Sequence, residues 1–276
     1  MTRNRGSIHE TKLHSCGAVI ADSARSDGVR GGVGSSNRAA DPGELDKSCA
    51  ALSIEEMLAQ VPRGESRLFE RPCADDGEER FFSVWQNYDY PGQIAWHNTV
   101  GMENNPWYGA RGVPRIPVSS VPTPDVSFKL SAKKLVDFYS TGNHAFFLSE
   151  RLIALIDRLD PGSLERRPVT IRASKGVEVP FFMAMPNRSL SAVDTRRTDV
   201  LVMDKDYAGE WIRSIKFPNG VSFRNQDLAG ISSFTDLDLT RWFWSRELIE
   251  AAKAEGIKGL RTLSARATTN FDVDRL

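Results

Sequence analysis

A short pattern of apolar and polar positions occurs twice in the chain. Residues 146–153 read FFLSERLI, and residues 242–249 read WFWSRELI. In each copy, an aromatic run that suits a buried strand stops at a serine, and an amphipathic pattern follows. A serine hydroxyl at that position accepts a hydrogen bond from an unpaired N–H group of the first helical turn. The pattern therefore predicts the same strand-to-helix corner at both places.

Apolar spacing extends each corner into a longer unit. In the first unit, residues 145–148 are predicted as a strand and residues 149–159 as a helix, because leucine and isoleucine recur there at three- and four-residue intervals. The second unit has a strand at 241–244, a helix at 245–255 and a strand at 260–263. Each unit thus has an apolar helix face to bury against a sheet.

Other segments read as strands. Apolar and β-branched runs predict a strand at 81–85 and two paired strands at 169–172 and 177–185. Residues 214–217 and 221–224 alternate apolar and polar positions on either side of Pro-Asn-Gly, which predicts a hairpin. Most of these strands are close in sequence to their expected partners, so the sheet is predicted to be mostly antiparallel.

Two further helices and one long loop complete the pattern. A capping box predicts a short helix at 53–59, and apolar spacing predicts another at 131–138. Prolines forbid regular helix in residues 88–124, which are predicted to be an ordered loop over the core. The fold class is therefore predicted as α+β, with a few amphipathic helices packed on the sheet.

Composition divides the chain into three parts. Residues 1–52 are rich in Gly, Ser, Ala, Arg and Asp, which predicts a disordered leader. Residues 53–79 are expected to form the short helix and an acidic linker, and residues 80–276 the α+β domain. The 36 basic residues balance the 36 acidic residues, which argues against a nucleic acid partner.

The cysteines and the hydropathy pattern suggest a compartment. The chain has three cysteines, an odd number without CxxC spacing, and these are expected to be free thiols in a reducing cytoplasm. It contains neither the apolar segment of a signal peptide nor an apolar run long enough to cross a membrane. The expected localisation is cytoplasmic, without membrane association.

No catalytic constellation is evident. His9 and His14 fall in the leader, and neither His97 nor His144 has a partner at the spacing of a known triad. The acidic pairs at 204–206 and 236–238 are interpreted as solvated turn residues rather than metal ligands, and no cofactor is expected. An enzyme of the hydrolase type, using His97 or His144 with a partner brought near by folding, remains the alternative.

Several elements in order resemble a known family. The helix start Ser149-Glu150-Arg151-Leu152 comes first, and a central apolar stretch ends in Asp194. A closing unit then runs from Ser245 through Leu248 to Gly256-Ile257-Lys258-Gly259-Leu260. Over roughly residues 80–265, this order resembles the immunity protein eleven family of bacterial polymorphic toxin systems.

The resemblance implies a non-catalytic binding protein whose partner is a cognate toxin domain. Such an inhibitor needs shape and charge complementarity over an ordinary interface, with a few buried anchors. Two segments, 86–118 and 187–213, are the candidate contact surfaces, because one is rich in aromatic residues and the other in arginine. The candidate interface residues are Trp96, Trp107, Tyr108, Arg188, Arg196, Arg197 and Arg213. A nucleic acid or carbohydrate binder that stacks its ligand on the aromatic loop is a third possibility.

Overall fold

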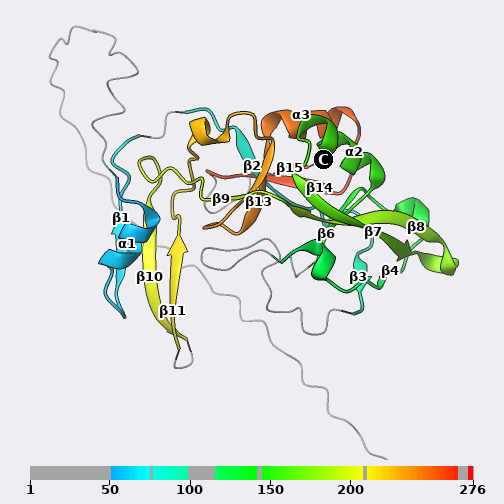
Figure 1. Ribbon diagram of the computed structural model, residues 1–276, viewed down its shortest axis with the longest axis horizontal. Helices are drawn as coiled ribbons and strands as arrows, with labels where there is room; N and C mark the ends of the chain where they lie inside the picture. Colours follow the sequence, from blue (N-terminus) through cyan, green and yellow to red (C-terminus); the bar gives the residue numbers. More distant parts are fainter. Residues whose placement is uncertain are drawn as a thin grey trace, which may run out of the picture. The chain divides into compact units, whose positions relative to one another are not determined.

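The computed structural model describes residues 51–74, 77–98, 116–141, 145–207, 210–266 and 273–275. All of these described residues belong to one compact unit of the chain. The expected leader therefore lies almost entirely outside the described residues, and the division into three parts stays a prediction. The described part is α+β, with α-helices and three sheets, as the sequence predicted (Figure 1).

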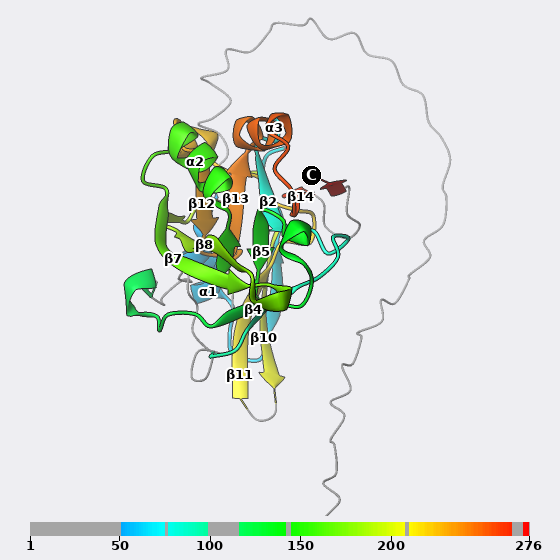
Figure 2. The ribbon, with the colours of Figure 1, turned by 90° about the vertical axis from the view of Figure 1, so that its right-hand side faces the viewer.

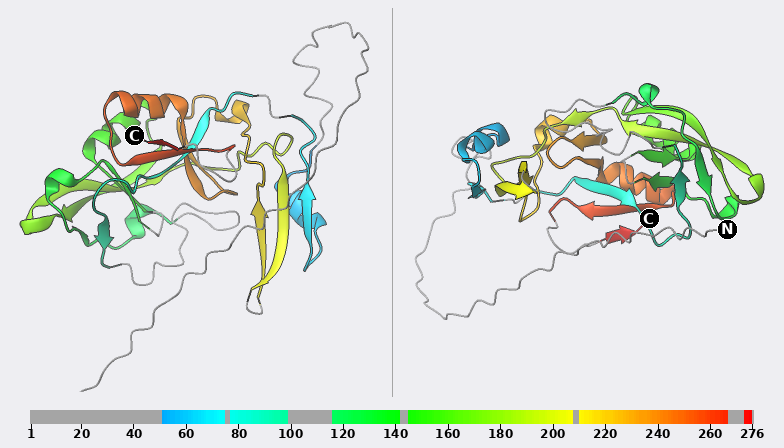
Figure 3. Two further views of the ribbon diagram at one scale, coloured as in Figure 1. Left: turned by 180° about the vertical axis from the view of Figure 1, so that it is seen from behind. Right: turned by 90° about the horizontal axis from the view of Figure 1, so that it is seen from below.

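The first six-stranded sheet has the order β15-β14-β2-β13-β12-β9. Its neighbours are antiparallel, except that β12 and β9 run parallel. Strand β2 lies between β13 and β14, so the strand expected near residue 81 is at the centre of the sheet (Figure 3). Its strands are β2 (Phe81–Gln86), β9 (Ser189–Leu190), β12 (Ser233–Asp236), β13 (Arg241–Ser245), β14 (Leu260–Ser264) and β15 (Val273–Arg275).

The second six-stranded sheet has the order β3-β4-β7-β8-β6-β5. Its longest pair, β7 and β8, is the antiparallel pair that the sequence predicted, and only β4 and β7 run parallel. Its strands are β3 (Ile94–Trp96), β4 (Val126–Phe128), β5 (Phe138–Ser140), β6 (Phe146–Leu148), β7 (Leu164–Arg172) and β8 (Glu178–Pro186). Short 3-10 turns occur at η2 (Val118–Ser120), η3 (Ala132–Lys134), η4 (Ser174–Gly176) and η5 (Asn225–Leu228).

A three-stranded sheet is formed by β1 (Ser66–Phe69), β10 (Val200–Tyr207) and β11 (Glu210–Lys216), with β10 in the middle. Helix α1 (Ile54–Gln60) lies beside it (Figure 1) and begins with the predicted capping box at Ser53. The apolar residues buried between them include Met57, Phe69 and Val200. Residues 53–79 thus contain a strand of this sheet as well as the expected short helix.

The two repeated corners are confirmed. Helices α2 (Glu150–Leu159) and α3 (Arg246–Ala254) each follow a strand, β6 and β13, and begin at a serine. The Ser149 hydroxyl accepts from the Leu152 N–H at 3.3 Å, and the Ser245 hydroxyl accepts from the Leu248 N–H at 3.2 Å. The two helices lie side by side (Figures 1 and 2).

One apolar cluster joins both helices to both six-stranded sheets. Its largest fully buried member is Trp244 on β13, and it includes Leu148 from β6, Leu152 from α2 and Leu248 from α3. Because the same side chains cover both sheets, neither sheet buries this apolar face without the other unit. The repeat therefore builds one shared core rather than two independent ones.

The predicted helix at 131–138 is wrong. Only Ala132–Lys134 forms a 3-10 turn, and Phe138 enters strand β5. The Tyr139 hydroxyl accepts from the Val136 N–H at 3.0 Å, and both Phe138 and Tyr139 are buried. Consecutive buried residues that point to opposite faces require a strand, since a helix would bring only one side inward.

The predicted hairpin at 214–224 is also wrong, although its turn exists. The Gly220 N–H donates to the Phe217 carbonyl at 3.2 Å, and the glycine has a φ of 76°. Strand β11, however, pairs with β10, and the Val221 N–H donates instead to the carbonyl of Ala265 at 2.7 Å. The turn itself was predicted correctly, but the strand before it and the residue after it pair with other parts of the chain.

Candidate functional site

Among the aromatic candidates, the structure describes Trp96, which packs against the second six-stranded sheet. Trp96 on β3 is half-buried, with its ring centroid 5.8 Å from that of Phe147, and its Nε1 donates to the Asn98 side chain at 2.8 Å. Tyr88 differs, because 61% of it is exposed. Trp107 and Tyr108 lie outside the described residues, so the aromatic surface is only partly in view.

The arginine candidates bind groups of their own chain. Arg188 pairs with the buried carboxylate of Asp160, and the Arg196 Nε lies 3.0 Å from Asp194. The Arg213 guanidinium donates to two carbonyls at the end of α1, those of Leu58 and Val61, at 3.0 Å each. These contacts give the three arginines a role in holding the fold.

Arg197 also belongs to this group, because its backbone N–H donates to the Asp194 carbonyl at 3.0 Å. The segment from 187 to 213 is thereby held against other parts of the domain by several of its polar groups. A role of these arginines in partner binding stays a prediction. Charge reversal at Arg188, Arg196 or Arg213 would disturb the fold as well as any interface, so a sharper test needs other residues.

Among the histidines, the structure describes His97 alone. Its Nε2 lies 2.6 Å from the Ser127 hydroxyl on the neighbouring strand β4. This is the histidine–serine approach that the enzyme alternative needs. His97 is exposed, however, and the adjacent Asp125 carboxylate pairs with Arg172. His9, His14 and His144 lie outside the described residues.

The helix-start motif has a clear structural role. Asp137, which is buried just before β5, accepts from the Arg151 Nε at 2.6 Å, the Ser149 hydroxyl at 2.7 Å and the Lys258 N–H at 2.8 Å. Arg151 also donates to the Gly256 carbonyl at 2.8 Å. The motif thereby ties the start of α2 to the turn after α3, and so joins the two repeated units.

This network also changes how Asp137 titrates. Burial would raise the pKa of its carboxyl, but the hydrogen bonds from Arg151, from Ser149 and from the Lys258 N–H together hold that pKa below its ordinary value. The ionised form is therefore the one that the fold stabilises. The sequence analysis did not identify Asp137 as a key residue. Its hydrogen-bond partners are 12 to 121 positions away in the chain, so no local pattern indicates them.

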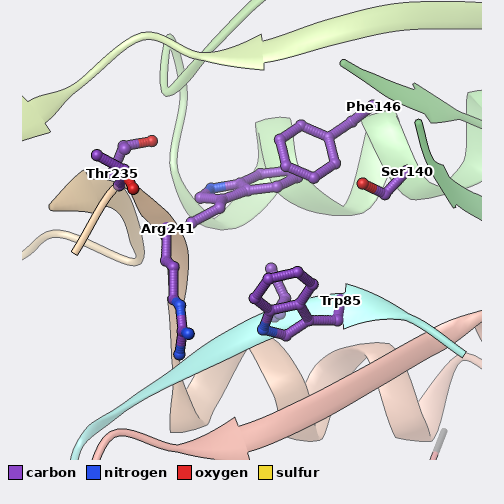
Figure 4. Close-up of a pocket in the computed structure, with 8 residues that line it drawn as sticks. Trp85, Ser140, Phe146, Thr235 and Arg241 are labelled. Atoms are coloured by element: carbon purple, nitrogen blue, oxygen red, sulfur yellow. The ribbon is translucent and has the colours of Figure 1, made fainter. Parts of the chain in front are cut away.

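A small cleft opens between the two six-stranded sheets, and we call it the β12–β13 cleft. Figure 4 shows Thr235 and Arg241 on one side of it, and Phe146 and Ser140 on the other. Its volume is 20 Å³, which is room for about one or two water molecules and too little for a typical substrate. Its lining residues are Val84, Trp85, Ser140, Phe146, Thr235, Thr240, Arg241 and Trp242.

The turn behind this cleft is held by a buried carboxylate. Asp236, which is fully buried, accepts from the backbone N–H groups of Ala192, Asp238 and Leu239 at 2.9–3.0 Å. The expectation that Asp236 is a solvated turn residue is therefore wrong, and so is the same expectation for Asp204, which is also buried. Burial raises the pKa of Asp236 to about 6, although the three N–H donors oppose that shift.

We expect Asp236 to make stability depend on pH. A carboxyl whose pKa rises on folding favours the folded state below its unfolded pKa, and that contribution is lost as the pH passes through about 6. Between pH 4 and pH 7, the unfolding free energy of the chain should therefore fall by about 2 kcal/mol relative to the Asp236→Asn variant. Urea unfolding across this range measures the difference.

The control for that measurement is Ser233→Ala, which alters the same strand without removing a titratable group. Its difference from the unaltered chain should stay constant with pH. A constant difference for Asp236→Asn as well would show that the pKa of Asp236 is not raised in the folded protein.

Two further findings concern metals and cysteines. Among the described residues, no group of three or more His, Cys, Asp or Glu side chains could hold a metal ion. Cys73 is disulfide-bonded, which contradicts the expectation of a free thiol at that position. Within the same described part, no helix is both long enough and apolar enough to span a membrane.

Comparison with known proteins identifies the family. No curated protein matches the chain. The model of the Immunity protein family (Imm11), however, matches residues 84–266, from strand β2 to just beyond β14. The match includes both repeated corners and the Asp137 network, and it covers more than half of the chain. The chain therefore belongs to the Imm11 immunity protein family.

Proposed function

We propose that this chain is an immunity protein that neutralises a cognate bacterial toxin domain by tight stoichiometric binding, without catalysis. The observation that carries the proposal is the family match over residues 84–266, which takes in most of both six-stranded sheets. The partner would be a toxin domain of a polymorphic toxin system, and the complex would form in the cytoplasm of the producing cell or a sibling. Binding would cover or distort the active site of the toxin.

The structural roles of the buried carboxylates support a binding function. Asp137 and Asp160, two buried carboxylates that could have served chemistry, accept hydrogen bonds from arginine and from backbone N–H groups that hold the fold. The β12–β13 cleft has room for a side-chain tip rather than a substrate. An inhibitor that works by occlusion needs a stable surface and no turnover.

The candidate interface remains a proposal. It comprises an aromatic part, with the exposed Tyr88 and the half-buried Trp96, and an arginine part between residues 187 and 213. Exposed aromatic side chains provide a large rigid contact area and often anchor interfaces. Trp107 and Tyr108 belong to the same proposal.

The test is co-expression with the C-terminal domain of the protein encoded next to this chain. We expect the chain to restore growth and to co-purify with that domain in a stable stoichiometric complex. Co-purification followed by size-exclusion chromatography checks the stoichiometry. Growth without any complex would contradict binding as the mechanism, and failure to restore growth would contradict the toxin assignment.

The hydrogen bond between His97 and Ser127 gives the enzyme alternative one specific observation. The variant His97→Ala separates the two functions. If the chain acts by binding alone, His97→Ala should protect cells as well as the unaltered chain does. A loss of protection with the complex intact would favour a catalytic role for the pair.

A further inference from the structure

We propose that one end of the second six-stranded sheet docks an acidic surface of the toxin domain. This inference rests on the proposed function and adds to it a place on this chain and a chemical feature of the partner. The surface, which we call the lysine patch, is formed by two segments outside 86–118 and 187–213. Its residues are Lys129, Leu130, Lys133, Lys134, Lys175 and Val177.

The two segments of the lysine patch meet where β4 ends and where β7 turns into β8. Strands β4 and β7 run parallel, with Ser127 opposite Arg172, so the residues that follow each strand leave the same end of the sheet. The Ser174 N–H donates to the Leu130 carbonyl at 3.0 Å, which joins the two segments directly. Figure 1 shows the turn after β7 at the tip of the β7–β8 pair.

The lysines of the patch carry charge that the fold does not use. All four are exposed, and within the described part of the chain none has an ion-pair partner for its ammonium group. In contrast, Arg158, Arg188 and Arg196 pair with carboxylates. Glu178 is the single acidic residue in the segments 129–134 and 174–178, although the whole chain is neutral. The patch is therefore a local excess of positive charge, which attracts an acidic partner.

The patch also exposes two large apolar side chains. Leu130 is 38% exposed and Val177 is 47% exposed, and they are two of the four large apolar side chains that are exposed among the described residues. An apolar centre with a charged rim is typical of a protein interface, since the partner buries the centre while the rim stays hydrated. A phosphate backbone would pair with the lysines alone. The apolar pair therefore favours a protein partner over a nucleic acid.

The backbone at Lys175 is strained. Its φ is 62°, in the left-handed region that residues other than glycine rarely adopt. The turn is closed by the Ala173 N–H, which donates to the Val177 carbonyl at 2.8 Å. Glycine would adopt this conformation without strain, so a lysine stands where the backbone favours another residue. Such an exception points to a use for the side chain, which the fold itself does not provide.

The lysine patch adjoins the aromatic part of the candidate interface. A Cβ atom at Gly92 would lie 2.9 Å from the Leu130 Cδ1, so the loop that contains Gly92 rests against the patch. The exposed Tyr88 belongs to the same loop, which is closed by a hydrogen bond between the side chains of Gln86 and Gln93. One partner can therefore contact both surfaces, and the patch extends the candidate interface around the end of the sheet.

The charge of the patch is tested with the triple variant Lys129→Glu/Lys133→Glu/Lys175→Glu. The probe is the toxin domain encoded next to the chain, and surface plasmon resonance measures its association and dissociation rates. At low salt, the association rate should fall by about 100-fold, because rim charges act mainly on the encounter. The difference should shrink in about 1 M salt, which screens these charges. Lys253→Glu, at an exposed lysine of α3, is the control and should change both rates little.

The variant Lys175→Gly separates the charge of Lys175 from its backbone. Glycine removes the strain at this position, so the midpoint of thermal unfolding should not fall. The association rate at low salt should nevertheless fall by about threefold, because one cation of the patch is lost. A variant that is as stable as the unaltered chain but associates more slowly cannot owe that loss to unfolding. An unchanged association rate would contradict a docking role for Lys175.

The apolar centre is tested with the double variant Leu130→Ala/Val177→Ala. Truncating apolar contacts acts mainly on dissociation, so the dissociation rate should rise by about tenfold while the association rate changes little. The control is Leu68→Ala on β1, because Leu68 is also 47% exposed but lies in the three-stranded sheet. Its dissociation rate should equal that of the unaltered chain.

The outcomes separate this inference from the proposed function. If the unaltered chain binds the toxin domain but the triple variant associates at the same rate, the lysine patch is wrong and the proposed function stands. If the triple variant loses binding to a random-sequence DNA duplex but keeps its toxin affinity, the patch serves a nucleic acid and the inference is overturned. If the unaltered chain does not bind the toxin domain, both proposals fail.

Discussion

Replacing Asp137 with alanine is expected to lower the free energy of unfolding by about 3 kcal/mol. The change removes the acceptor for the Arg151 guanidinium, the Ser149 hydroxyl and the Lys258 N–H at once, and a buried donor left unpaired costs about 1–3 kcal/mol. Arg151 is half-exposed, so its charge regains water and limits the loss. Urea unfolding at neutral pH measures the effect.

The matched control is Arg158→Ala. Arg158 on α2 pairs with Glu255 at the end of α3, and both side chains of that pair are exposed. Its substitution should therefore lower the free energy of unfolding by less than about 1 kcal/mol. The effect of Asp137→Ala should also diminish at acid pH. The pKa of Asp137 is lowered by folding, so its contribution is present above the unfolded pKa and is lost as the pH falls through the folded one. Equal losses for the two variants would contradict the role of Asp137.

The second large effect is expected at Gly259, in the turn between α3 and β14. Its φ is 93°, and a Cβ atom there would lie 2.5 Å from the Val136 Cγ2 and 2.7 Å from the Phe138 carbonyl oxygen. The carbonyl is backbone and cannot move aside without disturbing β5. We expect Gly259→Ala to destabilise the domain by about 3 kcal/mol, from the backbone strain and the overlap together.

Gly256→Ala separates the two causes. Gly256 also has a positive φ, 63°, but a Cβ atom there would meet no atom within 4 Å. Its substitution should therefore cost only the strain of the left-handed backbone, about 1–2 kcal/mol. Thermal unfolding of the two variants gives the comparison. A cost at Gly259 no larger than that at Gly256 would show that the turn can move away from β5.

Much of the local structure follows from the sequence. The two serine-capped corners, the capping box at Ser53 and the β7–β8 pair are where the pattern predicts them, because caps and alternation depend on residues a few positions apart. The family could also be identified at this level, since its motifs are short and occur in a fixed order. For the same reason, the helix-start motif at Ser149 can be recognised in the sequence, although its hydrogen bonds to Asp137 cannot.

The two wrong secondary-structure predictions have the same physical cause. In the segment 131–138, local spacing favours a helix, but burial of Phe138 and Tyr139 on opposite faces favours a strand. At Gly220, the turn is local, whereas the partner of the following residue is Ala265. In both cases contacts with distant residues outweigh a weak local preference.

The candidate site shows the same division. Aromatic and arginine residues could be selected from composition, yet the structure uses Arg196 and Arg213 within the fold. The β12–β13 cleft could not be selected, because the pairing of Thr235 with Trp242 and the approach of β5 and β6 exist only after folding.

The sequence alone therefore determines the α+β class, the repeated strand-to-helix corners and the family. These depend on the period of apolar positions and on caps, which act over a few residues. Only the tertiary structure decides that the two corners share one core, that Asp137 joins them, and that Thr235 and Trp242 line a cleft. Each of these depends on side chains that are distant in the chain and brought together by burial, which no local pattern encodes.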